Sequence, residues 1–224
     1  MIWVNVGMQE FLKVTGIVIG VFPQGEYDRR IVLLTREQGK LTAFVKGARR
    51  QGSRFCAATD MFAFGTFDLY VGRNSYNVQD VKITNYFENL RNDIESAYYA
   101  MYFAELADYY GVEGGDDAVL LLLLYRALQG LKSEKLSNPF VRYVYEIKLF
   151  FIEGEIIPID RAGEFSDATY AAVDYIGSAS IEILYNFAVT DPVMEDLKTI
   201  GDYERKHIIE RKPKSLEILE PIIQ

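Results

Sequence analysis

The residues whose types and spacing suggest chemistry are basic and aromatic, and they lie close together in the sequence. Thr42, Phe44 and Lys46 alternate with apolar residues, so they share the outer face of a predicted strand. A glycine-containing loop with Arg49 and Arg50 follows directly. Nucleic-acid bases stack on exposed rings at about 1–3 kcal/mol each, while cations contact the phosphates. This pattern predicts a surface that binds single-stranded nucleic acid.

Further basic residues extend this candidate surface. Residues 29–54 contain eight Lys or Arg residues and one acid, Glu37. The excess cations repel one another unless an anion binds, and in small nucleic-acid barrels the second and third strands with their loops form the binding face. Two alternative interpretations stay open: a solvated basic surface, and a Phe44 ring that packs against the helical domain and never meets solvent. The candidate DNA-binding residues are Arg29, Arg30, Lys40, Phe44, Lys46, Arg49, Arg50, Arg54 and Arg73, with Tyr27 and Tyr76 in neighbouring loops.

The residues before position 85 have the pattern of strands and turns. β-rich or alternating segments predict strands at residues 12–22, 30–35, 41–46, 62–71 and 76–84. Gly39 lies in a short loop where a positive φ would close a hairpin. Five short strands in about 75 residues suit a small closed barrel. The count alone does not distinguish a barrel from a sandwich.

After residue 85 the apolar spacing becomes helical. It predicts helices at residues 93–110, 117–132, 138–153, 167–176 and 191–211. Asn138-Pro139 and Asp191-Pro192 each fit an N-cap followed by proline. Residues 119–124 are apolar on every side, so this helix is expected at the centre of a bundle. The predicted layout is a β domain at residues 8–84 followed by an all-α domain at residues 85–224.

Composition limits the function classes. Of 224 residues, half are hydrophobic and a quarter charged, which is typical of a globular protein. A single cysteine, Cys56, and a single histidine, His207, exclude an internal disulfide and a cysteine-based zinc site. We expect Cys56 to be a small buried hydrophobe and His207 a surface or capping residue. No G-x-S-x-G, P-loop or H-E-x-x-H motif occurs, so we predict that the protein is not an enzyme.

The terminus and the apolar runs indicate the compartment. Residues 1–9 lack the pattern of a secretory signal. The longest aliphatic run, residues 119–124, is far shorter than the roughly 20 residues that span a bilayer. We therefore expect a soluble cytoplasmic protein without a membrane partner.

The charge is unevenly distributed. The formal net charge is −8, yet residues 1–90 hold 11 Lys and Arg against 8 Asp and Glu, whereas residues 91–224 hold 13 against 24. Salt screens charges over roughly 8 Å at physiological strength, so the distant acids need not cancel a local basic surface. A nuclease would need a carboxylate cluster for its metal, and residues 29–54 contain only Glu37.

Several segments resemble the bacterial RecO family of recombination mediators and DNA repair proteins. The resemblance rests on residues 14–19, 25–29, 33–40, 45–50, 64–67, 69–73 and 214–219. The most specific of these segments is Lys46-Gly47-Ala48-Arg49-Arg50 in its strand–loop context. It covers nearly the whole chain, and residues 1–7 precede the family pattern, so we expect Met8 to be the native start.

The resemblance implies an OB-fold barrel followed by a helical domain. It also implies binding of single- and double-stranded DNA, annealing of complementary strands, assembly with RecR, and contact with the C-terminal tail of the single-stranded-DNA-binding protein. By motif, Lys46, Arg49 and Arg50 would contact DNA, with Arg29 and Lys40 nearby.

The sequence departs from the family at one place and leaves one site open. Many members carry a four-cysteine zinc module, but residues 155–166 are few and contain no cysteine, so we expect no metal or other cofactor. The partner-tail site cannot be placed; Arg142 and Lys148 are candidates for it and equally for plain surface charges. An adaptor whose basic barrel binds an acidic peptide is the alternative function.

Overall fold

A computed structural model describes residues 10–73, 75–159 and 164–222 of the chain. The expected start at Met8 and the first nine residues lie outside this description. The contacts divide the chain into two compact units. One contains the chain up to Phe87 together with Ala107–Leu121, and the other contains Glu88–Leu106 and the chain from Leu122 onward.

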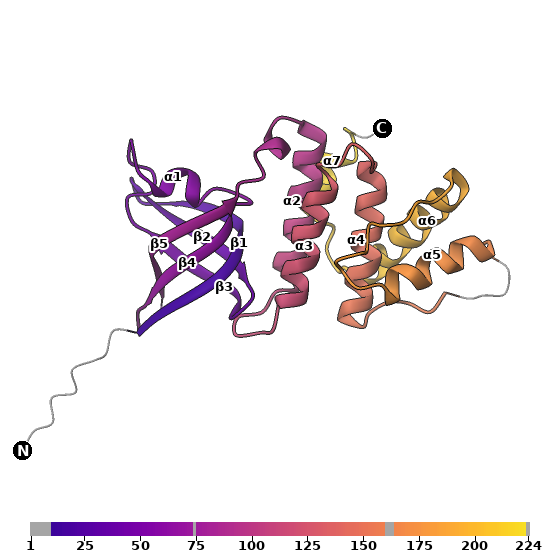
Figure 1. Ribbon diagram of the computed structural model, residues 1–224, viewed down its shortest axis with the longest axis horizontal. Helices are drawn as coiled ribbons and strands as arrows, with labels where there is room; N and C mark the ends of the chain where they lie inside the picture. The colour runs from indigo at the N-terminus through magenta and orange to yellow at the C-terminus, as the bar shows by residue number, and fades with distance from the viewer. Residues whose placement is uncertain (1–9, 74, 160–163, 223–224) are drawn as a thin grey trace, which may run out of the picture. The chain divides into compact units, whose positions relative to one another are not determined.

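The first unit is built on a closed five-stranded barrel (Figure 1). Its strands are β1 (Glu10–Gln24), β2 (Asp28–Thr35), β3 (Gly39–Val45), β4 (Phe64–Val71) and β5 (Tyr76–Asn85). They follow the order β1-β2-β3-β5-β4, in which only the β3–β5 pair is parallel. This is the architecture of an OB-fold, so the predicted fold class is confirmed and the sandwich is excluded.

Alternating side chains explain why these strands close around one core. In β3 the apolar Leu41, Ala43 and Val45 are buried, while Thr42 and Phe44 point outward and are partly exposed. The predicted outer face of β3 is thus confirmed. The other strands supply their inward residues to the same core, which comprises Val14, Val18, Ile31, Leu33, Leu41, Ala43, Val45, Ala48, Ala63, Phe67, Leu69 and Val78.

A short helix between β3 and β4, α1 (Phe55–Ala58), was not predicted (Figure 1). Ala58 is buried and Phe55 packs against the barrel core, so these two residues occupy the inward positions of the single turn. Cys56 is consequently exposed. The expectation of a buried Cys56 is wrong because the preceding phenylalanine takes the apolar position.

The segment that follows α2 (Ile94–Tyr110) pairs with the β2–β3 turn within the same unit. Gly39 forms an isolated β-bridge with Glu113, and the adjacent Lys40 N–H donates to the Val112 carbonyl at 3.1 Å. Gly39 has a φ of +59°, as predicted, and a Cβ atom at this position would overlap the Val112 carbonyl. This position therefore requires glycine, and the pairing fixes the loop around Glu113.

The remaining elements are helical. They are a short 3₁₀ turn, η1 (Glu88–Arg91), and the helices α2 (Ile94–Tyr110), α3 (Ala118–Gly130), α4 (Asn138–Glu153), α5 (Asp167–Ser178), α6 (Asp191–Ile208) and α7 (Lys214–Leu219). The last helix, α7, was not predicted. No helix in the described parts of the chain combines the length and apolarity that a bilayer crossing requires.

The most enclosed helix is α4, which packs against α5 and α6. Every residue from Phe140 to Phe150 is buried. The prediction that α3 is the central helix of a bundle is wrong for the start of the helix, where Val119 keeps 49% of its surface exposed. The charged residues Arg142, Glu146 and Lys148 make α4 look exposed in the sequence, but each of them has a polar partner inside the helical unit.

The caps of α4 and α6 lie one residue before the predicted positions. The Ser137 hydroxyl accepts the Phe140 N–H and caps α4, while the Asn138 side chain donates to Glu95 at 3.0 Å. Thr190 occupies the N-cap position of α6. In both helices the proline therefore lies in the first turn, one position later than predicted, where its missing N–H costs no helical hydrogen bond.

Candidate nucleic-acid interface

A row of aromatic and polar side chains crosses the outer face of the barrel. In the strand register Phe22 lies opposite Arg30, Arg30 opposite Phe44, and Phe44 opposite Asn77. Directly opposed residues project from the same face of a sheet. The Arg30 guanidinium lies 4.3 Å from the centroid of the exposed Phe22 ring. The face thus alternates rings with hydrogen-bonding groups.

A basic loop adjoins this row. Lys46 is exposed directly after β3, and Arg49 and Arg50 are exposed in the turn that follows. The Arg49 N–H donates to the Tyr27 carbonyl at 2.8 Å, and its guanidinium donates to the Gly25 carbonyl at 3.2 Å. The Arg50 guanidinium lies 5.2 Å from the Tyr27 ring centroid. These contacts hold the loop against the β1–β2 turn.

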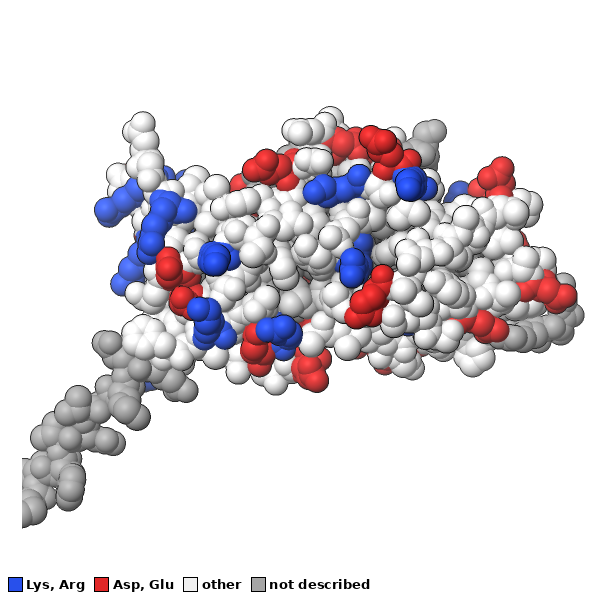
Figure 2. Space-filling model, viewed as in Figure 1, with Lys and Arg blue, Asp and Glu red and all other residues white. Residues whose placement is uncertain are grey.

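The cations of this loop keep their charge free for a ligand. Among the described residues, Lys46, Arg49 and Arg50 have no carboxylate partner, and the same holds for Arg30 and the exposed Arg73. Figure 2 shows basic side chains gathered over the end of the barrel where α1 lies. Cation–π contacts and bonds to carbonyls orient guanidinium groups without neutralising them.

Other predicted cations are engaged within the protein. The Lys40 ammonium forms an ion pair with Asp108 at 3.3 Å, and Arg54 forms one with Asp80 at 3.0 Å. Arg29 donates to the Cys56 carbonyl at 2.6 Å and so ties β2 to α1. The expectation of unpartnered cations throughout residues 29–54 is therefore wrong. Folding brings in acids such as Asp80 and Asp108 that lie outside this segment.

Arg73 lies at a groove beside the outer face of β3. The groove has a volume of about 480 Å³ and lies within the barrel unit. Strand β3 contributes one wall, the β4–β5 turn another, and Glu113 stands at its rim. Its lining consists of Thr42, Phe44, Val71, Gly72, Arg73, Ser75, Tyr76 and Glu113.

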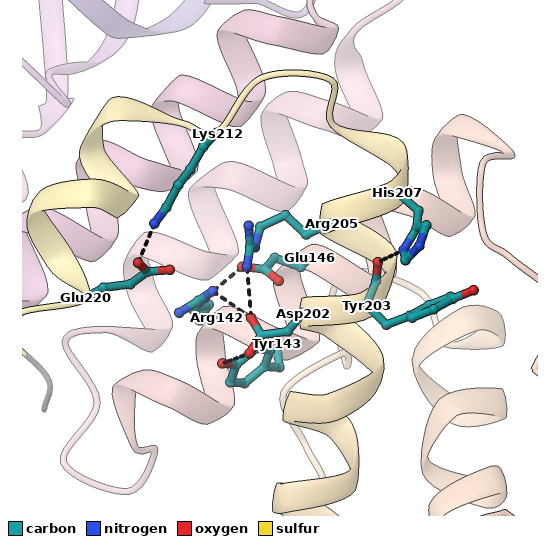
Figure 3. A network of polar contacts seen from close by, with 9 residues as sticks. All are labelled: Arg142, Tyr143, Glu146, Asp202, Tyr203, Arg205, His207, Lys212 and Glu220. Atoms are coloured by element: carbon teal, nitrogen blue, oxygen red, sulfur yellow. Dashed lines mark hydrogen bonds and ion pairs between the residues drawn. The ribbon is translucent and has the colours of Figure 1, made fainter.

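The helical unit contains a buried ionic network (Figure 3). Arg142 is only 3% exposed, and its Nε donates to Glu146 at 2.7 Å while another guanidinium nitrogen lies 3.2 Å from Asp202. Arg205 binds the same Asp202 oxygen at 3.2 Å. Burial alone would lower the pKa of Arg142, but the Glu146 carboxylate raises it above its ordinary value. Arg142 is thus permanently charged and internally satisfied.

Neither candidate for the partner tail is available on the surface. Lys148 is buried and donates to the carbonyls of Gly177 at 2.8 Å and Ala179 at 2.7 Å. Burial lowers the pKa of the Lys148 ammonium. Both interpretations of Arg142 and Lys148, as partner contacts and as plain surface charges, are therefore wrong.

His207 and the acids suggest no further chemistry. His207 is exposed in the last turn of α6, and its Nδ1 lies 2.7 Å from the Tyr203 carbonyl oxygen, so the expected surface role is confirmed. Among the described residues, no group of three or more His, Cys, Asp or Glu side chains is placed to hold a metal ion. Residues 160–163 of the stretch expected to lack a zinc module lie outside the description.

Sequence reasoning missed three members of this surface. Phe22 and Asn77 belong to it only through the strand register. Glu113 reaches the groove from a loop more than 60 residues further along the chain than β3. The alternation in β1 could have indicated Phe22, but no local signal pairs Glu113 with Gly39.

Comparisons with known proteins place the chain in a family. A family model described as "Recombination protein O N terminal" matches residues 8–87, and one described as "Recombination protein O C terminal" matches residues 91–158. The chain belongs to the RecO family. Curated relatives named DNA repair protein RecO agree with this assignment over most of the chain.

Two RecO relatives align along nearly their full lengths, and a third aligns along part of its length. The protein from Acetivibrio thermocellus is 24% identical, covering 95% of this chain and 97% of the relative. The protein from Clostridium novyi is 24% identical, covering 95% and 94%. That from Symbiobacterium thermophilum is 37% identical over 63% of this chain and 56% of its own length. The chain is thus a DNA repair protein of the RecO family, and its membership implies partners in the DNA-repair machinery.

Proposed function

We propose that this RecO-family protein is a non-enzymatic recombination mediator that binds single- and double-stranded DNA on its barrel and anneals complementary strands. The supporting observation is the combination of an aromatic row with cations that have no carboxylate partner in the described parts of the chain. Arg30 lies within the row, and Lys46, Arg49 and Arg50 lie in the loop beside it. Phosphates supply the missing anions, while bases stack on Phe44.

Annealing on this surface requires no catalytic group. Two DNA strands repel each other as polyanions, and the repulsion falls when protein cations neutralise phosphates and release counterions. The stacking energy of bases on rings holds each strand extended, with its pairing edges accessible to the complementary strand. No covalent bond forms or breaks, which fits a protein whose proposed interface consists of cations and rings.

The partner assignments rest on family membership. In this proposal the protein acts in the cytoplasm, assembles with RecR to load the recombinase, and contacts the C-terminal tail of the single-stranded-DNA-binding protein. We further propose that the DNA-binding part corresponds to residues 8–84 and the scaffold for partner proteins to residues 85–224. The segment Ala107–Leu121 supports the barrel from within the second range.

Fluorescence anisotropy with a labelled oligonucleotide and with a labelled acidic peptide tests this proposal. We expect the oligonucleotide to bind more tightly, because a peptide of acids alone offers nothing to stack on Phe44. The double variant Arg49→Glu, Arg50→Glu should lose most oligonucleotide binding and strand annealing. Lys198→Glu with Lys206→Glu makes the same charge change on α6 and should bind like the parent.

Two results would contradict the proposal. One is peptide binding without oligonucleotide binding, which would make the protein an acidic-peptide adaptor. The other is a double variant at Arg49 and Arg50 that binds and anneals like the parent although circular dichroism shows it folded. Adding magnesium should cause no strand cleavage, because a nuclease needs a cluster of metal ligands and the described residues contain no such cluster.

A further inference from the structure

The groove beside β3 contains an acid on an otherwise basic face. Its volume of about 480 Å³ falls within the range of about 300–1,000 Å³ that is typical of small-ligand sites. Phe44 lines it on one strand, and Tyr76, which also packs against the barrel core, lines it on the next. Glu113 and Arg73 bring opposite charges to the same groove. A nucleotide has complementary parts: a flat base for Phe44, a polar base edge for Glu113 and an anionic phosphate for Arg73.

The backbone fixes Glu113 at this place. Its bridge with Gly39 lies between two further hydrogen bonds, from Lys40 N–H to the Val112 carbonyl at 3.1 Å and from Gly114 N–H to the Gln38 carbonyl at 3.0 Å. The Glu113 carboxylate itself is exposed and has no hydrogen-bond or ion-pair partner among the described residues. The backbone therefore places in the groove a carboxylate that has no donor among the described residues.

The charge of Glu113 determines which part of a DNA strand can enter the groove. A carboxylate repels phosphate and accepts hydrogen bonds only from donors. Phosphates thus stay near Arg30, Lys46 and Arg73, and a base turns its edge toward Glu113. Guanine offers two adjacent N–H donors on its Watson–Crick edge, which a carboxylate can accept together. Thymine offers one donor between two carbonyl oxygens, and those oxygens are repelled.

We infer that Glu113 makes this groove a subsite for an unpaired base and that the subsite prefers guanine to thymine. The inference rests on the proposed binding of single strands to the barrel. It adds base selectivity to a surface whose cations alone would bind every sequence equally. Phe44 supplies the stacking surface in this subsite and Arg73 holds the adjoining phosphate.

Competition anisotropy with oligonucleotides tests the inference. A short oligothymidylate is compared with the same oligomer carrying one central guanine, in the parent protein and in Glu113→Gln. The parent should bind the guanine-containing strand at least about fivefold more tightly, the lower end of discrimination by a good bidentate pair. Glu113→Gln should lose this preference, because an amide presents only one acceptor oxygen and a donor. It should bind oligothymidylate at least as tightly as the parent, since a repulsive charge is removed.

A matched variant controls for net charge. Glu134 is exposed in the helical unit, and Glu134→Gln should keep the guanine preference. Equal affinities of the parent for both oligonucleotides would overturn the inference while leaving DNA binding intact. A preference that persists in Glu113→Gln would overturn it as well. Failure of the parent to bind either strand would instead reject the proposed function.

Discussion

The salt dependence of single-strand binding measures how many barrel cations are free to contact phosphates. Of the eight predicted cations, Lys40 and Arg54 pair with carboxylates, and the Arg29 guanidinium is held by the Cys56 carbonyl of α1. Among the described residues this leaves five cations free for phosphate, namely Arg30, Lys46, Arg49, Arg50 and Arg73. Each neutralised phosphate contributes about −0.7 to the slope of log affinity against log salt. We therefore predict a slope of about −3.5, whereas all eight basic residues of the predicted set would give about −5.6.

Single neutralisations make this prediction specific to individual residues. Arg50→Gln should reduce the slope by about 0.7, because the Arg50 guanidinium stacks on Tyr27 and keeps its charge available. Arg54→Gln should leave the slope unchanged, because Asp80 already neutralises Arg54. The two variants remove the same charge from nearby positions, so each is the control for the other.

Anisotropy titrations with a labelled oligothymidylate, between about 50 and 200 mM salt, give the slopes directly. Circular dichroism verifies that each variant is folded. A parent slope near −5.6, or an Arg54→Gln variant that loses as much slope as Arg50→Gln, would refute the reasoning that internal ion pairs remove cations from the interface.

Three further predictions concern stability. Arg142→Met should lower the free energy of unfolding in urea by about 3–5 kcal/mol, because it leaves the buried Glu146 charge without its cation, and Glu146→Leu added to it should restore much of the loss. Gly65→Ala should lower the thermal midpoint of the barrel by overpacking, at a cost of about 1–3 kcal/mol, because a Cβ atom would overlap the backbone of β5. Burial alone would raise the pKa of Glu105, but hydrogen bonds from Ser215 lower it overall. The Glu105 carboxylate therefore stabilises the folded state fully above pH 4.5, and this contribution is lost as the pH falls below that value. Denaturation curves at a series of pH values should show this loss in the parent but not in Glu105→Gln.

The strands of the barrel could be predicted because the alternation of apolar and polar residues that indicates a strand lies within each short segment. Alternation in β3 places Thr42 and Phe44 outside and their neighbours inside, and all five strands lie within two residues of their predicted ends. The strand order β1-β2-β3-β5-β4 was not predicted, since five short strands alone do not distinguish a barrel from a sandwich. Cys56 was misplaced because a four-residue helix offers too few positions for an apolar period to be recognised.

The members of the site could be predicted only in part, since charge pairing depends on tertiary structure. Arg54 and Arg50 look alike in the sequence, but Asp80 pairs with Arg54 from a strand more than 20 residues away. The sequence does not reveal that Arg142 is buried, because one partner lies one helical turn along α4 and the other lies on α6, which is far along the sequence although it packs against α4. That Phe22 and Arg30 are neighbours likewise follows only from the pairing of β1 with β2.

The barrel unit is discontinuous in sequence, because residues Ala107–Leu121 belong to it and Glu88–Leu106 do not. A fragment ending at residue 87 would lose the chain that bonds to Gln38, Gly39 and Lys40, and with it the acid at the rim of the groove. Chimeras between RecO relatives must therefore exchange both stretches together. A chimera joined directly after β5 would pair the β2–β3 turn of one relative with the segment around Glu113 of another relative, whose sequence is matched to a different turn.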